Sequence, residues 1–299
     1  MISILVTGAN GQLGSDLRAI ASQYPKFRIT FADRQRLDLC DIEKFEQLLD
    51  LYWPQYVINA AAYTDVEKAE HNQRAAFAVN AEALGPIGEL CKKRRIKVLQ
   101  ISSDYVYHTE SDTPITEETP LAPKGLYARS KYHGEKNLIA SGASSLIIRT
   151  SWLYSSFGDN FVKTMLELSK KKKPIKVVSD QIGAPTYARD LAKAILDIVL
   201  KTEEDQIPWK GDIYNYSNTG ETSWYGFAEK IFSLSKIEKV RLIPINSSEY
   251  PSNVQRPLNS RLALDKIINT WGLSIRSWEE ALKAMFEDAE ERENNKWRP

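Results

Sequence analysis

Residues 2–7 read ISILVT and residues 8–14 read GANGQLG. A short apolar, β-branched run of this kind is typical of a strand buried on both faces. Glycine permits backbone torsions that are closed to other residues and lets main-chain N–H groups approach a pyrophosphate. The last glycine allows the following helix to pack closely on the strand. The stretch therefore predicts a strand, a dinucleotide-binding turn with the spacing G-x-x-G-x-x-G, and a helix.

Strand and helix patterns alternate downstream of this turn. Strand-like runs cover residues 28–32, 56–60, 98–102 and 146–149, with helical patterns between the earlier ones at 42–51 and 74–94. This order indicates right-handed βαβ crossovers. The sequence thus predicts an α/β fold with a Rossmann-type doubly wound parallel sheet.

The pattern becomes irregular after Thr150. Helices are expected at 160–172, 187–200, 224–235 and 278–292, and short strands at 213–217 and 242–245. We expect a dinucleotide-binding domain over residues 1–150, to which the chain returns within 176–218. Residues 151–299 are expected to form mainly a smaller α/β substrate-binding domain that completes the cleft.

Composition excludes several classes of partner. Lys and Arg number 40 and Asp and Glu 39, so the chain lacks the broad basic surface that nucleic-acid binding needs. Two widely spaced cysteines are no disulfide framework, and the three histidines have no metal-ligand spacing. No basic leader precedes the first strand, and Asp197 interrupts the longest apolar stretch, at 194–200. We expect a soluble, cytoplasmic protein with no membrane or nucleic-acid partner.

The second predicted strand ends at Asp33-Arg34, where a cofactor ribose would lie. A carboxylate there accepts hydrogen bonds from ribose hydroxyls and favours NADH, whereas Arg34 or Arg36 could hold a 2′-phosphate and favour NADPH. The sequence leaves both open. Small side chains after the third strand leave room beside the pyrophosphate. The expected cofactor-binding residues are Gly8, Asn10, Gly11, Gln12, Leu13, Gly14, Asp33, Arg34, Asp38, Leu39, Ala60, Ala61, Ala62, Tyr63, Asn80, Tyr127 and Lys131.

Three residues form a candidate catalytic set. Tyr127 and Lys131 lie four residues apart in a helical pattern and so share one face. A phenol normally titrates near pH ~10, and a neighbouring ammonium, with the cationic nicotinamide, is expected to lower that pKa. Ser103 follows the strand at 98–102, at the carboxyl end where open α/β sheets bind ligands. Its hydroxyl can hydrogen-bond a substrate carbonyl.

The same spacing recurs at Tyr132 and Lys136. Five residues turn a helix by roughly 500°, which places the second pair about 140° from the first. Both pairs therefore cannot face one cleft. We assign the first pair to the site and the second to a packing or solvated face.

Longer motifs make the chain similar to the dTDP-4-dehydrorhamnose reductases, members of the extended short-chain dehydrogenase family. The similarity covers nearly the whole length, and the most specific motifs lie beyond the nucleotide domain. The motifs are TGANGQLG (7–14), NAAAYT (59–64), VEKAE (66–70), SDYVY (103–107), YARSK (127–131) followed by Gly134-Glu135, RTSWLY (149–154), DQIGAPT (180–186) and RPLNS (256–260).

The resemblance implies reduction of dTDP-4-dehydro-L-rhamnose to dTDP-L-rhamnose, with hydride transfer from NADPH or NADH to sugar C4. In that scheme Tyr127 supplies the proton, Lys131 holds the nicotinamide ribose, and Ser103 orients the keto oxygen. The residues implied to line the sugar pocket are Asp104, Tyr105 and Trp152, and Arg256 is implied to meet the diphosphate.

The chain departs from the family pattern at two places. Ser103 stands where threonine is usual, which keeps the hydroxyl. Some members bind Mg²⁺ through acidic residues at a dimer contact, and the matching positions here are Asp16, Asp190 and Glu287 or Asp288. Shorter carboxylates change the reach, so we expect no metal, with Asp16, Asp190 and Asp288 as the candidates if Mg²⁺ binds. A homodimer remains an open expectation.

Other functions are weighed against the same residues. A 4,6-dehydratase needs an Asp-Glu pair after the strand hydroxyl, but Asp104 is followed by Tyr105. Reduction or epimerisation of another nucleotide-activated keto-deoxysugar stays open. So does a non-catalytic NADP-binding regulatory subunit resembling the β-subunit of methionine adenosyltransferase, against which the intact Ser103, Tyr127 and Lys131 argue.

Overall fold

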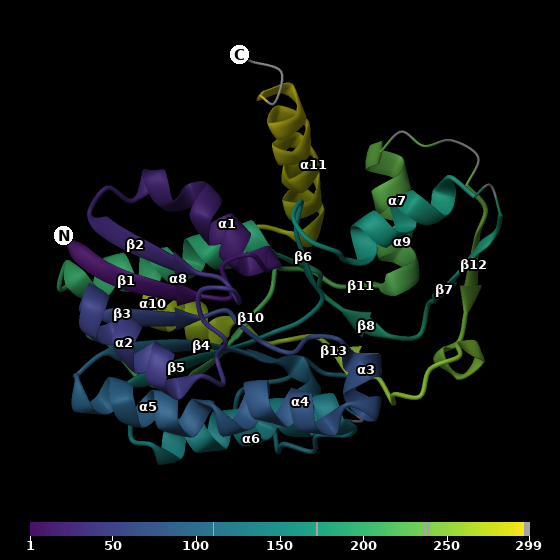
Figure 1. Cartoon of the computed structure of the whole chain (residues 1–299). Coiled ribbons are helices and arrows are strands. Elements are labelled where there is room, and N and C mark those ends of the chain that lie inside the picture. The colour runs from purple at the N-terminus through teal and green to yellow at the C-terminus, as the bar shows by residue number, and fades with distance from the viewer. Residues whose placement is uncertain (110, 172, 236, 238–239, 296–299) are drawn as a thin grey trace.

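A six-stranded parallel sheet forms the centre of the computed structural model (Figure 1). The structure describes residues 1–109, 111–171, 173–235, 237 and 240–295, except for the side chains of 293–295. The strand order is β10-β5-β4-β3-β1-β2, and every neighbouring pair is parallel. The strands are β1 (Ile2–Thr7), β2 (Phe27–Ala32), β3 (Tyr56–Asn59), β4 (Lys97–Ser103), β5 (Ser145–Thr150) and β10 (Ile213–Tyr216). This order confirms the predicted doubly wound sheet.

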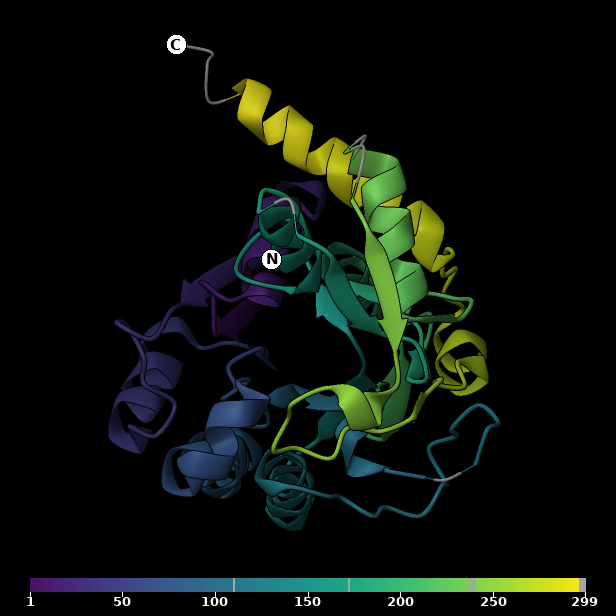
Figure 2. The same cartoon turned by 90° about the vertical axis from the view of Figure 1, so that its right-hand side faces the viewer.

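Helices cover both faces of the sheet (Figures 1 and 2). Ile4 and Val6 of β1 belong to the core on one face and Leu5 to the core on the other, because successive strand residues point to opposite faces. The first face carries α1 (Gln12–Ile20), α8 (Ala188–Glu203) and α10 (Asp265–Trp271). The second carries α2 (Ile42–Tyr52), α5 (Leu84–Lys93) and α6 (Leu126–Ala140).

The chain reverses its direction across the sheet at β1. It runs outward from β1 to β2, then returns to place β3 on the other side of β1. The turns that follow β1 and β3 therefore lead to opposite faces and leave a crevice at the carboxyl ends of these strands. The glycine turn follows β1, so it lies at this switch point.

A smaller part with its own apolar core lies beside the sheet. It holds the helices α7 (Phe161–Ser169), α9 (Trp224–Ser235) and α11 (Trp278–Asn295), which share a cluster around Phe227. Its short strands pair as β7 with β12, β8 with β11 and β13, and β6 with β9. Their bounds are β6 (Leu153–Tyr154), β7 (Ile175–Val178), β8 (Ile182–Gly183), β9 (Thr186–Tyr187), β11 (Thr222–Ser223), β12 (Leu242–Ile245) and β13 (Asn259–Ser260).

The helix predicted over 74–94 is present but contains a π-helical turn that the sequence pattern did not indicate. The segment contains α4 (Gln73–Phe77), a π-helical turn at Ala78–Glu82 and then α5. Pro86 at the start of α5 has no N–H, so it cannot donate to the carbonyl four residues earlier, and the hydrogen-bond register changes just before it. A helix that was not predicted, α3 (Val66–His71), precedes α4 and is capped by Asp65, which accepts from the Lys68 amide at 2.9 Å.

Short 3₁₀ turns complete the described chain. They are Ala21–Gln23, Asp104–Val106 and Ser247–Glu249. Cys40 is exposed and Cys91 is buried, and both are free thiols. In the described part of the chain, no helix is both long enough and apolar enough to cross a membrane.

Candidate active site

The glycine turn packs so closely against neighbouring backbone that no side chain could be accommodated at Gly8 or Gly14. Gly8 has φ +67°, and a Cβ there would lie 2.5 Å from the Ala61 amide nitrogen. A Cβ on Gly14 would lie 2.3 Å from the Gly8 carbonyl oxygen. The clashing atoms are all backbone and cannot move aside. The turn is therefore held tightly between the ends of β1 and β3.

The start of α1 is open to an anion. Its N-cap is Gly11, which has no side chain to accept from the first amides of the helix. Unpartnered N–H groups and the positive end of the helix dipole form an anion site there. The absence of side chains at Gly8 and Gly14 and the uncapped start of α1 together leave a place for a pyrophosphate. The residues that the sequence predicts to hold a dinucleotide are therefore suited to that ligand.

The carboxylate at the end of β2 already accepts two hydrogen bonds from the protein. Asp33 receives the Asn10 amide at 2.9 Å and the Arg36 backbone N–H at 2.9 Å. These bonds, the Arg36 amide foremost, lower the pKa of Asp33. The Arg36 guanidinium bonds to the Phe31 carbonyl and to the Tyr52 hydroxyl. Arg34 is the freer cation, since its side chain is 87% exposed and lies 3.7 Å from Asp38.

Among the other residues expected at the cofactor, Asp38 and Leu39 follow β2, Tyr63 follows β3, and Asn80 lies in the π-helical turn. Leu39 is buried, and Asp38 accepts from the Cys40 amide at 3.0 Å. The buried Asn80 amide bonds to the backbone of Tyr63 and to Ser130 on α6, which fixes the turn after β3 against that helix. As cofactor contacts these residues stay predictions.

The structure brings Ser103, Tyr127 and Lys131 together. Ser103 ends β4, and its hydroxyl lies near enough to the Tyr127 phenol to lower the pKa of that phenol. Lys131 lies one turn further along α6 and is buried, with its ammonium donating to the Ile101 carbonyl at 2.8 Å. The ring of Tyr105 meets the edge of Tyr127 at a centroid distance of 5.5 Å. The three predicted catalytic side chains thus converge at the carboxyl end of β4.

Burial controls the titration of this set. It raises the pKa of Tyr127, as do the nearby Asp104 and Tyr105, while the neighbouring Ser103 hydroxyl opposes the rise. The expectation that this pKa is lowered is not met in the protein alone, where burial raises it and Lys131 is not among its causes. Burial also lowers the pKa of Lys131 to about 8. At neutral pH Tyr127 is therefore a protonated phenol, ready to donate.

The second Tyr-x-x-x-Lys pair lies outside the site. The Lys136 ammonium sits over the Tyr132 ring, 5.5 Å from its centroid, and Lys136 is exposed. Tyr132 packs against a satellite apolar cluster that includes Val106 and Leu262. This arrangement matches the expected packing role.

Asp104 is buried between two serine hydroxyls, one of which is that of Ser103. It accepts from Ser103 Oγ at 3.0 Å and from Ser260 Oγ at 2.6 Å. Burial raises the pKa of Asp104 to about 6, against the lowering effect of the two hydroxyls. Ser260 closes the RPLNS motif, so the C-terminal part reaches the catalytic strand through this contact.

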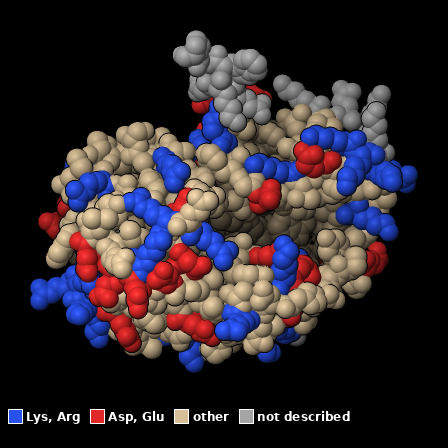
Figure 3. Space-filling view, in the orientation of Figure 1, with Lys and Arg blue, Asp and Glu red and all other residues tan. Residues whose placement is uncertain are grey.

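A pocket of about 680 Å³ lies in the smaller part and extends to Arg256. Figure 3 shows the surface hollowed near the middle of the view, between the sheet and the smaller part. Its walls include the apolar Val177, Met165 and Trp224 and the polar Gln181. Trp152, with φ +49°, stacks on Trp224 at a centroid distance of 3.8 Å. Trp152 therefore supports a residue of the pocket wall, and its contact with a sugar stays a prediction.

Arg256 links this pocket to the catalytic set. Its Nη1 lies 3.5 Å from the Tyr105 hydroxyl, and its Nη2 donates to Glu67 of α3 at 3.0 Å. Ser252 Oγ donates to the same Glu67 oxygen at 2.6 Å. The Nε of Arg256 is buried without a partner among the described residues. A cation with one unused donor in the lining of a pocket suits an anionic ligand.

The three carboxylates named as metal candidates do not fit a cation. Asp16 accepts from Arg189 and Ser155, Asp288 from Arg189 and Tyr187, and Asp190 from Arg276 and Asn218. Each oxygen that a metal would need already has a donor. Within the described residues no group of three His, Cys, Asp or Glu side chains is placed to hold a metal. The candidate Mg²⁺ site is thus occupied by guanidinium groups.

Sequence reasoning assigned no role to a buried ion pair behind Lys131. Arg149 donates to Glu135 through Nε at 3.0 Å and Nη2 at 2.6 Å, and both side chains are at most 3% exposed. The Glu135 charge favours the ammonium form of Lys131. The position of Glu135, one turn after Lys131 on the same helical face, was the available signal. Glu67 had no such signal, since Arg256 lies 189 residues away.

Comparisons with known proteins agree with this geometry. The family model described as the RmlD substrate binding domain matches residues 2–291. A dTDP-4-dehydrorhamnose reductase of Aggregatibacter actinomycetemcomitans is 35% identical over 95% of this chain and 98% of its own. A crystal structure of the Bacillus anthracis dTDP-4-dehydrorhamnose reductase in complex with NADP is 35% identical, with a TM-score of 0.89 over 96% of this chain and all of that one. A probable dTDP-4,6-dihydroxy-2-methyloxan-3-one 4-ketoreductase of Streptomyces antibioticus is 33% identical over 95% of this chain and 94% of its own.

Proposed function

The chain belongs to the RmlD substrate-binding-domain family, and from that premise we propose that it reduces dTDP-4-dehydro-L-rhamnose to dTDP-L-rhamnose with NADPH or NADH. The observation that carries the proposal is the convergence of Ser103, Tyr127 and Lys131 at the carboxyl end of β4, on the same edge of the parallel sheet as the glycine turn after β1. With a reduced nicotinamide as the source of hydride, this set would bind and protonate the oxygen of a ketone as it becomes an alcohol. The dTDP-sugar is the substrate named for relatives that match almost the whole chain.

The reaction needs one hydride and one proton. The reduced nicotinamide, when bound on the glycine turn, supplies the hydride that reduces sugar C4. Ser103 donates a hydrogen bond to the keto oxygen and Tyr127 donates its phenolic proton to the same oxygen, so the carbonyl becomes an alcohol. The Lys131 ammonium stabilises the phenolate that remains and binds the ribose hydroxyls. The high pKa of Tyr127 keeps the proton available until the oxygen becomes basic.

Two parts of the chain divide this work. Residues 1–150, with α8 and β10 from within 176–218, supply the cofactor turn and the catalytic set. The rest of 151–299 supplies the pocket with Trp224 and Arg256. We place the nucleotide diphosphate near Arg256 and the sugar between Tyr105 and the Asp104–Ser260 contact.

The assay that tests the function mixes purified protein, each reduced cofactor and a panel of dTDP-keto-sugars, and follows nicotinamide absorbance. The proposal expects consumption with the 4-keto-6-deoxy sugar of L configuration. Preference for another keto sugar would favour the second candidate function, the reduction of a different dTDP-keto-sugar. The Streptomyces antibioticus relative, a probable 4-ketoreductase of such a sugar, motivates this candidate. No consumption with any of them would favour a regulatory NADP-binding subunit.

The cofactor choice is tested at Arg34. Its guanidinium is exposed and has only a 3.7 Å ion pair with Asp38 among the contacts described, while hydrogen bonds to the protein occupy Asp33 and Arg36. We expect Arg34→Ala to raise KM for NADPH about tenfold and to leave KM for NADH within about twofold, since one charge-assisted contact is worth roughly 1.5 kcal/mol. Arg28→Ala, on the same strand, is the control. Equal effects on both cofactors would remove Arg34 from the phosphate site.

Glu67 is expected to compete with the substrate for Arg256. A diphosphate at Arg256 must share the guanidinium with the Glu67 carboxylate, and the two anions repel one another. Glu67→Gln keeps an oxygen for Ser252 and removes the charge, so KM for the dTDP-sugar should fall by about fivefold or less, with kcat unchanged. Because the pair is partly exposed, the effect should shrink in high salt. An increase in KM would show instead that Glu67 orients Arg256 productively.

A further inference from the structure

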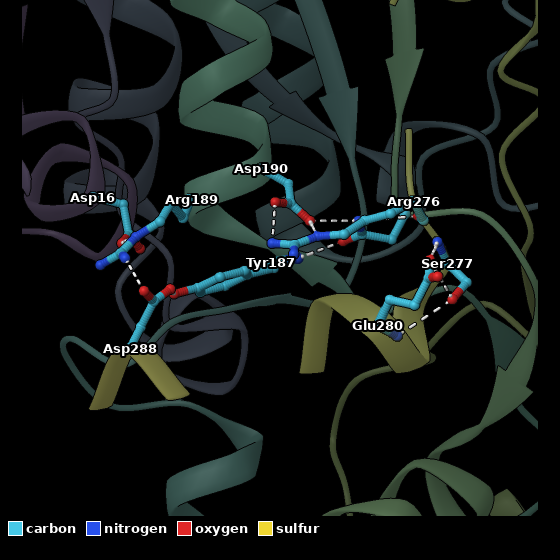
Figure 4. Close-up of polar contacts among 9 residues, drawn as sticks. Asp16, Tyr187, Arg189, Asp190, Arg276, Ser277, Glu280 and Asp288 are labelled. Atoms are coloured by element: carbon cyan, nitrogen blue, oxygen red, sulfur yellow. Dashed lines mark hydrogen bonds and ion pairs between the residues drawn. The ribbon is translucent and has the colours of Figure 1, made fainter. Parts of the chain in front are cut away.

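One guanidinium joins the helix after the glycine turn to the C-terminal helix (Figure 4). Arg189, at the start of α8, donates from Nε to Asp16 Oδ1 of α1 at 3.2 Å. Its Nη1 pairs with Asp288 Oδ1 of α11. Three helices that are distant in sequence therefore meet at a single side chain.

The other oxygens of the two carboxylates are held by hydroxyl groups. Ser155 donates to Asp16 Oδ2 and Tyr187 donates to Asp288 Oδ2, both at 2.6 Å. Asp16 is fully buried, and burial raises the pKa of its carboxyl. A buried carboxylate requires a cation, because removing it from water without one is costly. Arg189 is the cation in contact with it.

The same contacts reach the first turn of α1. The loop that begins at Ser155 places Asn160 Nδ2 3.1 Å from Gln12 Oε1. A Cβ on Gly158 would lie 3.1 Å from Gln12 Cγ. Arg292 of α11 covers the Phe157 ring of this loop, 3.9 Å from its centroid. The loop is therefore held between α11 and the residue that opens the anion-binding end of α1.

We propose that Arg189 is a positioning residue that fixes α1 at the cofactor turn, bridging Asp16 and Asp288 as a divalent cation would. Each carboxylate has one oxygen for the guanidinium and one for a hydroxyl donor. Removing the guanidinium leaves the two Oδ1 atoms facing a common space, and carboxylate oxygens are the ligands that Mg²⁺ and Ca²⁺ prefer. The wild-type protein is thus independent of divalent cations, and an arginine-free variant becomes dependent on them.

Thermal unfolding of Arg189→Ala with EDTA and then with excess MgCl₂ or CaCl₂ tests this. We expect Tm to fall by about 5 °C in EDTA and to recover by at least about half with a cation. Wild type and Lys193→Ala, which removes an exposed cation one turn along α8, should change by less than about 1 °C with the cation. The double variant Arg189→Ala/Asp288→Asn should show no recovery, because one of the two ligands is gone.

Several results would overturn the proposal. They are an unchanged Tm for Arg189→Ala, equal recovery in the double variant, or a comparable cation response in wild type. If Arg189→Ala does not fold, Asp288→Asn is used instead. Hydrogen exchange of the α11 amides should then be about tenfold faster relative to that of the α10 amides. Unchanged exchange would reject the proposed role of the Arg189 bridge between Asp16 and Asp288. The dissociation constant for NADPH should rise when Tm falls and decrease again when Tm recovers. This is the one readout that rests on the proposed function.

Discussion

Tyr127→Phe is expected to lower kcat by about 10²-fold or more, which is the usual value of a positioned general acid. The variant loses the phenolic proton and keeps the ring, so the edge contact with Tyr105 and the packing of α6 survive. The dissociation constant for NADPH should stay within about twofold, since the ring is not its main anchor. Steady-state kinetics and fluorescence titration measure the two quantities.

Tyr132→Phe is the matched control for this change. It removes the same hydroxyl from the other Tyr-x-x-x-Lys pair on α6, where Lys136 covers the ring. Turnover in that variant should equal wild type. If Tyr127→Phe also retained near wild-type turnover, Tyr127 would not be the proton donor.

Lys131→Met is expected to lower kcat/KM by about 10²-fold and to remove a limb of the pH profile. Methionine fills similar space but brings no charge to stabilise the phenolate. Burial places the pKa of the Lys131 ammonium at about 8. Reductase activity in wild type should therefore be full below that pH and fall as pH rises through it, because the ammonium is the active form.

Glu135 influences the pH at which the Lys131 ammonium loses its proton. Its charge favours the ammonium, so Glu135→Gln should shift the high-pH limb to lower pH, while Lys131→Met should show no such limb. Rates measured between about pH 6 and 10 resolve the difference. A high-pH limb unchanged in Lys131→Met would assign the titration to another group.

The fold of residues 1–150 could be predicted from local sequence patterns. The run ISILVT and the glycines after it predict β1, the turn and α1, because burial and glycine torsions are properties of neighbouring residues. Ser103, Tyr127 and Lys131 were found in the same way, from a strand end and a helical spacing. Short-range spacing in sequence becomes short distance in space within one element.

The rest depends on contacts between segments far apart in the chain. Strands of two residues, such as β8 and β13, have no periodicity to detect and form only through pairing with distant segments of the chain. The contact of Asp104 with Ser260 spans 156 residues, and that of Asp16 with Arg189 spans 173. The pKa of Tyr127 was expected to be lowered by an adjacent ammonium, but it is set mainly by burial. Burial is a property of the folded structure that helical spacing does not report.

Transfer of label from cofactor to sugar tests the central claim most directly. The protein is given NADPH that is deuterated at both C4 positions of the nicotinamide, together with dTDP-4-dehydro-L-rhamnose, and the product is examined by NMR. We predict one deuterium at sugar C4 for each cofactor oxidised, and loss of this transfer in Tyr127→Phe. Product without deuterium at C4, or no product from a protein that binds NADPH, would contradict the account.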